Sequence, residues 1–98
     1  MDQRSIIARL RECEAELRAR GVAHAALFGS RARGDNRPDS DVDIMVEMSP
    51  EARVGVFQFV EIVNVIEDMF PLRVDVSNSS AQKPHIRSTA QRDAIYAF

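Results

Sequence analysis

The sequence is poor in the features that would indicate a secreted or membrane-bound protein. It has a single cysteine, Cys13, which excludes an internal disulfide and a cysteine-based metal site. No apolar run reaches the length of a transmembrane helix, and the N-terminus, charged throughout, is unlike a signal peptide. We therefore expect a cytoplasmic protein without membrane contact.

An excess of charge of either sign is also missing. The 13 Lys and Arg residues nearly balance the 15 Asp and Glu residues, and the formal net charge is -2. Strong sequence-independent binding to nucleic acid needs a clear excess of basic residues, so direct nucleic-acid binding is not expected. The chain has 98 residues and no internal repeat or linker. It is expected to form one domain, residues 1–98.

Hydrophobic periodicity and turn residues predict helices alternating with strands. The expected elements, in chain order, are a helix over 3–20 ended by Gly21, a strand over 22–28, a short turn that includes a loop over 34–40, a strand over 41–46, a helix that starts at Ser49-Pro50-Glu51 and ends before Pro71, a strand over 72–76, and a last helix from near Pro84. Within the turn, the stretch SRAR (30–33) could be helical. The second long helix is expected to bury Val56, Phe59, Val60, Val63 and Ile66, and the last one to carry Ile86, Ala90, Ala94 and Ile95. This order predicts an α/β layer structure. The link between the first two strands is too short for a crossover helix, so they are expected to pair antiparallel.

Three aspartates stand out in the predicted strands. Side chains at alternate positions share one face of a strand, about 6.6 Å apart along it. Asp41 and Asp43 therefore share a face, and Asp75 joins them if the two strands are neighbours. The apolar residues between them are expected to face the helices, namely Val42, Ile44, Val46, Val74 and Val76. A D-x-D pair taken alone is also typical of a solvated strand edge.

Three carboxylates on one face raise one another's pKa unless a cation lies between them. Mg²⁺ commonly binds one or two carboxylates together with substrate phosphates, and two such ions about 4 Å apart can hold the attacking and leaving oxygens of a phosphoryl group. The pattern therefore predicts a metal site at Asp41, Asp43 and Asp75.

The Gly29-Ser30 pair lies where an apolar strand ends and a short helix begins. Free amides at a helix N-terminus bind anions, and glycine lets a phosphate approach the backbone. Arg31 and Arg33 lie in the same stretch and could neutralise a polyphosphate. An ordinary tight turn with surface arginines explains this pattern by itself. Together with three acids, it favours a site for a triphosphate and its metal.

The combined motif resembles that of the DNA polymerase β-like nucleotidyltransferase superfamily. Gly29 and Ser30 are followed by ten residues and then by Asp41 and Asp43, and a later strand supplies Asp75. The form GSRARG…SDVDIMV is similar to the minimal nucleotidyltransferases, the MNT domains of bacteria and archaea. The resemblance implies the polymerase β-like fold, a small mixed sheet of about three or four strands flanked by helices.

The resemblance also implies roles for these residues. Gly29, Ser30 and Arg33 would bind the nucleotide phosphates, and Asp41 and Asp43 would bind two Mg²⁺ ions. Asp75 would complete the metal site and help to activate the acceptor hydroxyl. The expected reaction is transfer of a nucleoside monophosphate, AMP from ATP, to a hydroxyl of a partner protein.

Members of this family often pair with a helical HEPN protein, a ribonuclease toxin, for which the MNT protein is the antitoxin. The resemblance thus implies a HEPN-type partner, and the short chain leads us to expect that the acceptor comes from another molecule. Two other functions stay open. One is a non-catalytic antitoxin that neutralises its partner by contact, and the other is a nucleotidyltransferase that modifies a small molecule alone.

Overall fold

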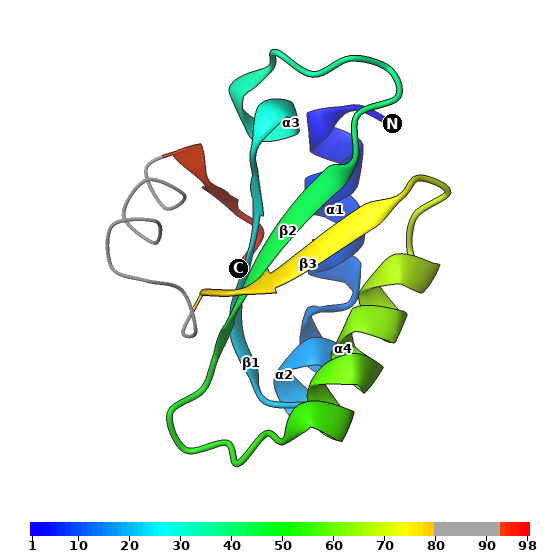
Figure 1. Cartoon of the computed structure of the whole chain (residues 1–98). Coiled ribbons are helices and arrows are strands. Elements are labelled where there is room, and N and C mark those ends of the chain that lie inside the picture. Colours follow the sequence, from blue (N-terminus) through cyan, green and yellow to red (C-terminus); the bar gives the residue numbers. More distant parts are fainter. Residues whose placement is uncertain (80–92) are drawn as a thin grey trace.

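The computed structural model describes residues 1–79 and 93–98 of the chain, and within them helices pack on a mixed sheet (Figure 1). The elements are α1 (Gln3–Glu12), α2 (Glu14–Ala19), β1 (Val22–Phe28), α3 (Ser30–Arg33), β2 (Val42–Met48), α4 (Val56–Asp68), β3 (Val74–Asn78) and β4 (Ile95–Tyr96).

The described strands form one sheet in the order β3-β2-β1-β4. β1 pairs antiparallel with both β2 and β4, whereas β2 and β3 are parallel and α4 connects them. The predicted α/β class, the small mixed sheet and the antiparallel first pair are therefore confirmed. β1 has the predicted bounds, and β2 and β3 extend two residues beyond the predicted ends.

The core lies between one face of the sheet and the helices α1, α2 and α4. The central strand β2 turns every second side chain towards it, as the alternation predicts. Burying one large aliphatic side chain contributes about 1.5–3 kcal/mol, so this face accounts for much of the stability. Its fully buried members include Ile6, Leu10, Leu17, Leu27, Val42, Ile44, Val46, Ile62 and Ile66.

The N-terminal helix is interrupted once, at Cys13, so the single helix predicted over 3–20 was wrong in that detail. The Cys13 backbone (φ -102°, ψ 11°) leaves the helical region. Its N–H donates to the Leu10 carbonyl (3.2 Å), three residues back, whereas a continuous α-helix would use the carbonyl four residues back. Asp2 caps the first helix by accepting from the Ser5 amide (2.8 Å). Gly21 follows the second helix with φ 101°, as expected of a left-handed terminus.

The predicted helix start at Ser49 was wrong. The Ser49 hydroxyl donates to the Glu51 carboxylate (2.9 Å) and its amide to the Gly21 carbonyl (2.8 Å), so this turn closes the β1–β2 end of the sheet. α4 begins only at Val56, where the Gln58 side chain accepts from the Gly55 amide (3.0 Å).

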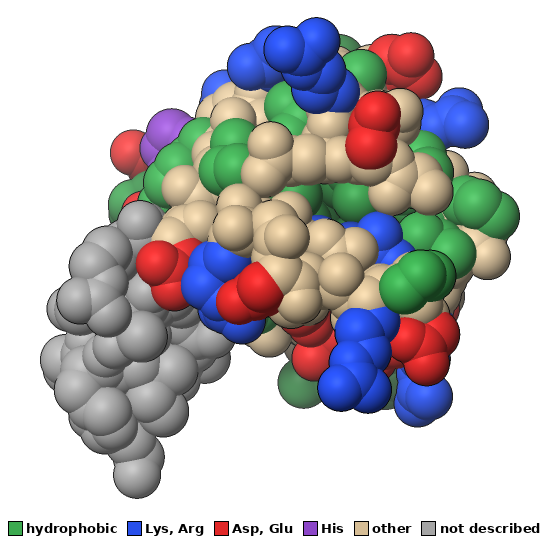
Figure 2. Space-filling view, turned by 90° about the horizontal axis from the view of Figure 1, so that it is seen from above, with side chains coloured by type: hydrophobic (Ala, Val, Ile, Leu, Met, Phe, Trp, Pro, Cys, Tyr) green, Lys and Arg blue, Asp and Glu red, His purple; other side chains and the backbone are tan. Residues whose placement is uncertain are grey.

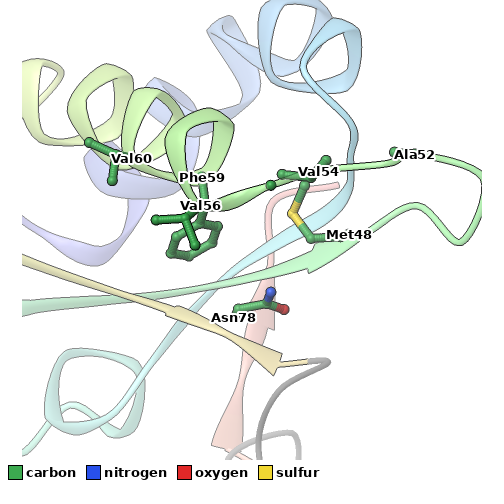
Figure 3. Close-up of a pocket in the computed structure, with 8 residues that line it drawn as sticks. Met48, Ala52, Val54, Val56, Phe59, Val60 and Asn78 are labelled. Carbon is green, nitrogen blue, oxygen red and sulfur yellow. The ribbon is translucent and has the colours of Figure 1, made fainter.

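The N-terminal half of α4 also differs from the prediction in its burial. Val56 and Val60, expected in the core, are 76% and 49% exposed, while Ile62 is buried instead. They line an open apolar pocket of about 460 Å³ together with Met48 and Phe59 (Figure 3). This pocket lies at the end of β2 opposite to Asp43.

The helix predicted from near Pro84 begins outside the described residues, and so do Ile86 and Ala90, which it was expected to carry. Ile95, expected on that helix, is in β4, where it pairs with Leu27 of β1. In the described part of the chain, no helix is both long enough and apolar enough to span a membrane. Seen from the α3 end, acidic and basic side chains are mixed rather than separated (Figure 2).

Candidate active site

Asp43 and Asp75 are direct neighbours on parallel strands. The register of β2 and β3 aligns Asp43 with Asp75, and Val42 with Val74. Adjacent strands lie about 4.8 Å apart, and aligned residues share a face. Because Val42 is in the core, both carboxylates lie on the face away from the helices. The register of the two strands therefore places the carboxylates of Asp43 and Asp75 side by side.

The electrostatics of Asp43 show which groups gather around it. Burial is the largest cause that raises the pKa of Asp43, followed by the negative charges of Asp75 and Asp41. The positive charge of Arg33 acts in the opposite direction. Asp41 precedes β2 and is exposed, so it stands at the entrance of this cluster. The three predicted acids and Arg33 are thus close enough to act on one carboxyl group.

The glycine turn lies directly against this cluster. β1 pairs Phe28 with Asp43, and Gly29 follows with φ 74°, which favours glycine. A Cβ atom built on Gly29 would meet the Asp43 carboxylate, with Cγ only 3.2 Å away. The missing side chain therefore lets the Asp43 carboxylate lie directly against the backbone at the start of α3. Amides at a helix start have no partner within the helix and can bind an anion.

Replacing Gly29 with Ala should destabilise the protein more than the same change at Gly34. Both glycines have positive φ, 74° and 84°, so both alanines pay for backbone strain, about 1–2 kcal/mol. Of these two glycines, only Gly29 faces a collision with the described residues, which adds about 1–3 kcal/mol, whereas none of their atoms lies within 4 Å of a Cβ at Gly34. Urea unfolding of the two variants measures the difference, and equal losses would contradict this geometry.

Arg31, one of the two arginines that could neutralise a polyphosphate, has a structural role. Its side chain is buried, with 6% exposure. The guanidinium donates to the carbonyls of Ser40 (2.8 Å), Pro38 (3.3 Å) and Met1 (3.2 Å). It therefore ties the loop before β2 to the N-terminus. That loop carries Asp41, so Arg31 supports the site from behind.

Arg31→Ala should cost about 2–3 kcal/mol of unfolding free energy, because three carbonyls lose a charged donor. Arg37→Ala, at an exposed side chain of the same loop, should change stability by less than about 0.5 kcal/mol. Chemical denaturation followed by circular dichroism checks both values. A stable Arg31→Ala variant would show that the loop needs no such tie.

Arg33 lies on the other side of α3 and keeps an exposed side chain. Its Nε atom is 3.1 Å from Asp35 Oδ2, and its Nη1 atom is 3.8 Å from Asp93 Oδ2. Asp93 had no place in the sequence motif, and no spacing rule connects it with Arg33.

The donor set fits a divalent cation that is shared with a substrate. Among the described side chains, no three His, Cys, Asp or Glu residues are arranged to enclose an ion by themselves. Asp43 and Asp75 instead form a pair of hard oxygen donors whose mutual repulsion a cation would relieve. Mg²⁺ commonly takes one or two carboxylates and completes its shell with water and substrate phosphates. The Gly29 backbone lies against Asp43, so phosphates bound at the start of α3 would be next to this pair.

Comparison with known proteins agrees with this geometry. The nucleotidyltransferase domain family matches residues 9–97. The protein adenylyltransferase MntA of Thermococcus cleftensis is 39% identical over 82 residues, which cover 83% of this chain and 81% of the relative. A Methanocaldococcus jannaschii protein, provisionally named a protein adenylyltransferase, is 34% identical over 76 residues, 76% of each chain.

Solved structures share the fold over nearly the whole chain. One, provisionally described as a minimal nucleotidyltransferase, has a TM-score of 0.79 and 27% identity, and covers 97% of this chain and 95% of its own. A toxin–antitoxin structure with AMP-PNP has a TM-score of 0.69 at 16% identity over 90% of this chain and 72% of its own, and shows the fold alone. The chain belongs to the nucleotidyltransferase domain family and is a nucleotidyltransferase.

Proposed function

We propose that this nucleotidyltransferase transfers AMP from ATP to a hydroxyl group of a partner protein, with Mg²⁺ as cofactor. The aligned pair Asp43 and Asp75, with the Gly29 turn packed directly against Asp43, is the observation that carries the proposal. The similarity to a protein adenylyltransferase supports AMP as the group transferred and a protein as the acceptor.

In the proposed reaction, the backbone at Gly29 and Ser30 and the guanidinium of Arg33 hold the phosphates. Asp43 and Asp75 would hold the metal as a pair of oxygen donors, and Asp41, at the entrance of the cluster, would add a third carboxylate. A bound divalent ion supplies charge neutralisation at the phosphoryl group and the leaving oxygen. The acceptor oxygen forms a bond to the α-phosphorus, the bond to pyrophosphate breaks, and Asp75 accepts the hydroxyl proton. Positioning and electrostatics of this kind supply most of the catalysis in phosphoryl transfer.

We further propose that the acceptor is a helical HEPN-type protein and that the two form a toxin–antitoxin pair. The resemblance of the Gly29-Ser30 and Asp41–Asp43 motif to the MNT domains supports this partner. A reaction that uses ATP would support the cytoplasmic location that we propose.

Incubation with α-labelled ATP, Mg²⁺ and the protein encoded beside this chain tests the proposal. The wild type should label that neighbour, and chelation of the metal should stop the labelling. The double variant Asp41→Asn with Asp43→Asn should not label it, whereas Glu67→Gln with Asp68→Asn, two exposed acids on α4, should label like the wild type. Equal labelling by both double variants would refute the assignment of the acids.

The same variants separate catalysis from simple contact. In cells that express the partner, an antitoxin that needs catalysis loses its protection when Asp41 and Asp43 are replaced by Asn. If this double variant protects as well as the wild type, the protein neutralises its partner by binding alone.

A further inference from the structure

Arg33 is held between acids from two distant parts of the chain. Asp35 follows it closely in the loop after α3, and Asp93 precedes β4. The distances are 3.1 Å from Nε to Asp35 Oδ2 and 3.8 Å from Nη1 to Asp93 Oδ2. Arg33 also ends α3, the short helix that begins directly after Gly29, and Gly29 lies against the Asp43 carboxylate. One cation thus connects the catalytic acids with the C-terminal segment.

Of the two ion pairs, the contact with Asp93 is the better suited to fix the orientation of the Arg33 guanidinium. The Asp93 side chain is 32% exposed and that of Asp35 is 61% exposed, so water screens Asp93 less. The segment after Asp93 is tied to the sheet, because β4 pairs with β1 and Ala97 is buried. The Arg11 side chain also donates to the Ala97 carbonyl (2.9 Å). Asp93 is therefore close to the sheet, whereas Asp35 lies in a loop most of whose side chains are exposed, with its amide donating to the Ser30 carbonyl (3.1 Å).

We propose that Asp93 is a positioning residue that holds the Arg33 guanidinium beside the catalytic acids, ready for the phosphates of the nucleotide. The proposal rests on the proposed function, which gives Arg33 its phosphate contact. Asp93 itself touches neither substrate nor metal in this scheme. Its effect passes through Arg33, and the side chain of Arg33 stays 46% exposed and accessible to an anion.

This role predicts a specific sign for the effect on nucleotide binding. Asp93 carries a negative charge, so replacing it with Asn removes some repulsion of a triphosphate and should favour binding. Loss of the hold on Arg33 acts in the opposite direction. If positioning dominates, Asp93→Asn weakens binding only while Arg33 is present. If Asp93 instead masks Arg33 from the nucleotide, the same change strengthens binding.

A double-mutant cycle measures this coupling with a non-hydrolysable ATP analogue and Mg²⁺. With Arg33 present, Asp93→Asn should weaken binding about two- to fivefold, the range of a partly exposed ion pair. In the Arg33→Ala background, Asp93→Asn should not weaken binding. With Arg33 present, Asp93→Glu should keep most of the affinity that Asp93→Asn loses. Asp68→Asn, an equal change of charge on α4, should have no effect in either background. Stronger binding by Asp93→Asn, or the same weakening in both backgrounds, would overturn the proposal.

A second measurement is independent of nucleotide use. In the free protein, the Nε–Hε NMR signal of Arg33 should shift and its exchange with water should become faster in Asp93→Asn, and neither should change in Asp68→Asn. An unchanged Arg33 signal in Asp93→Asn would overturn the proposal even if the wild type binds ATP. A wild type that binds no nucleotide would instead refute the proposed function, and the Arg33 signal would then decide whether Asp93 holds the guanidinium.

Discussion

Replacing Asp43 with Asn should abolish nucleotidyl transfer while leaving the fold intact or more stable. Asp43 pairs with Asp75 in register, lies against Gly29 and contributes oxygen donors to the proposed metal site. Loss of an outer hydrogen-bond partner of a metal ligand already costs about 10–100-fold in activity or metal affinity. Loss of a ligand should therefore reduce transfer by more than about 100-fold, measured as incorporation of labelled AMP at saturating ATP.

The stability effect follows from the raised pKa of Asp43. In the folded protein, burial and the charges of Asp75 and Asp41 favour the protonated carboxyl. The folded state therefore holds this proton to higher pH than the unfolded chain, so the wild type loses stability as the pH rises from below 3.8 through the raised pKa. Asn has no such proton, so Asp43→Asn should gain stability relative to the wild type over that interval.

Urea unfolding of both proteins without metal, between pH 3 and 7, checks this difference. The two curves should coincide at the acid end and separate as the pH rises, with Asp43→Asn the more stable at neutral pH. Added Mg²⁺ should stabilise the wild type more than the variant. A variant that is less stable at every pH would mean that Asp43 has a structural role beyond the site.

The positions of the acids were predictable because they follow from local periodicity. Alternation in the stretches around Asp43 and Asp75 sets the face of each strand, and the crossover through α4 makes the two strands parallel. These facts need only short-range patterns and general topology rules. The contact between Gly29 and Asp43 needs in addition the register of β1 on β2, which no short pattern determines.

The two arginines of α3 show where composition alone misleads. Residues two apart on a helix differ by about 200° in direction, so Arg31 and Arg33 cannot point into the same site. Which of them turns inwards depends on the carbonyls of Ser40 and Pro38, which a distant part of the loop presents to Arg31. The pairing of Arg33 with Asp93 likewise depends on how the chain returns to the sheet.

The predictions of where α4 starts and of a helix at Ile95, which is in β4, were wrong for a similar reason. Ser49, Pro50 and Glu51 have the chemistry of a helix start, but Ser49 forms its hydrogen bonds with Glu51 and Gly21 and leaves no cap for a helix. Ile95 and Tyr96 have no alternating neighbours that identify a strand, and they pair with β1 because its second edge is available. In both cases a tertiary contact overrides a local preference.

Val42→Asp should have the largest effect on folding, because it places a carboxylate in the core one position away from the exposed Asp41. Val42 is fully buried on β2, in register with Val74, and its amide donates to the Arg73 carbonyl (2.8 Å). A buried charge without a partner costs several kcal/mol, about 3–5 kcal/mol in proteins. Domains of this size are stable by about 5–15 kcal/mol, so much of that stability should be lost.

Val42→Ala is the matched control, because it removes the same methyl groups without adding charge and should cost about 2 kcal/mol. Thermal unfolding by circular dichroism and the dispersion of amide NMR signals distinguish the two variants. The Ala variant should fold and transfer nucleotide, whereas the Asp variant should be largely unfolded near neutral pH and recover structure only as its carboxyl is protonated. If Val42→Asp folds as well as Val42→Ala, the core lies on the other face of β2, and the acids assigned to catalysis are the buried ones.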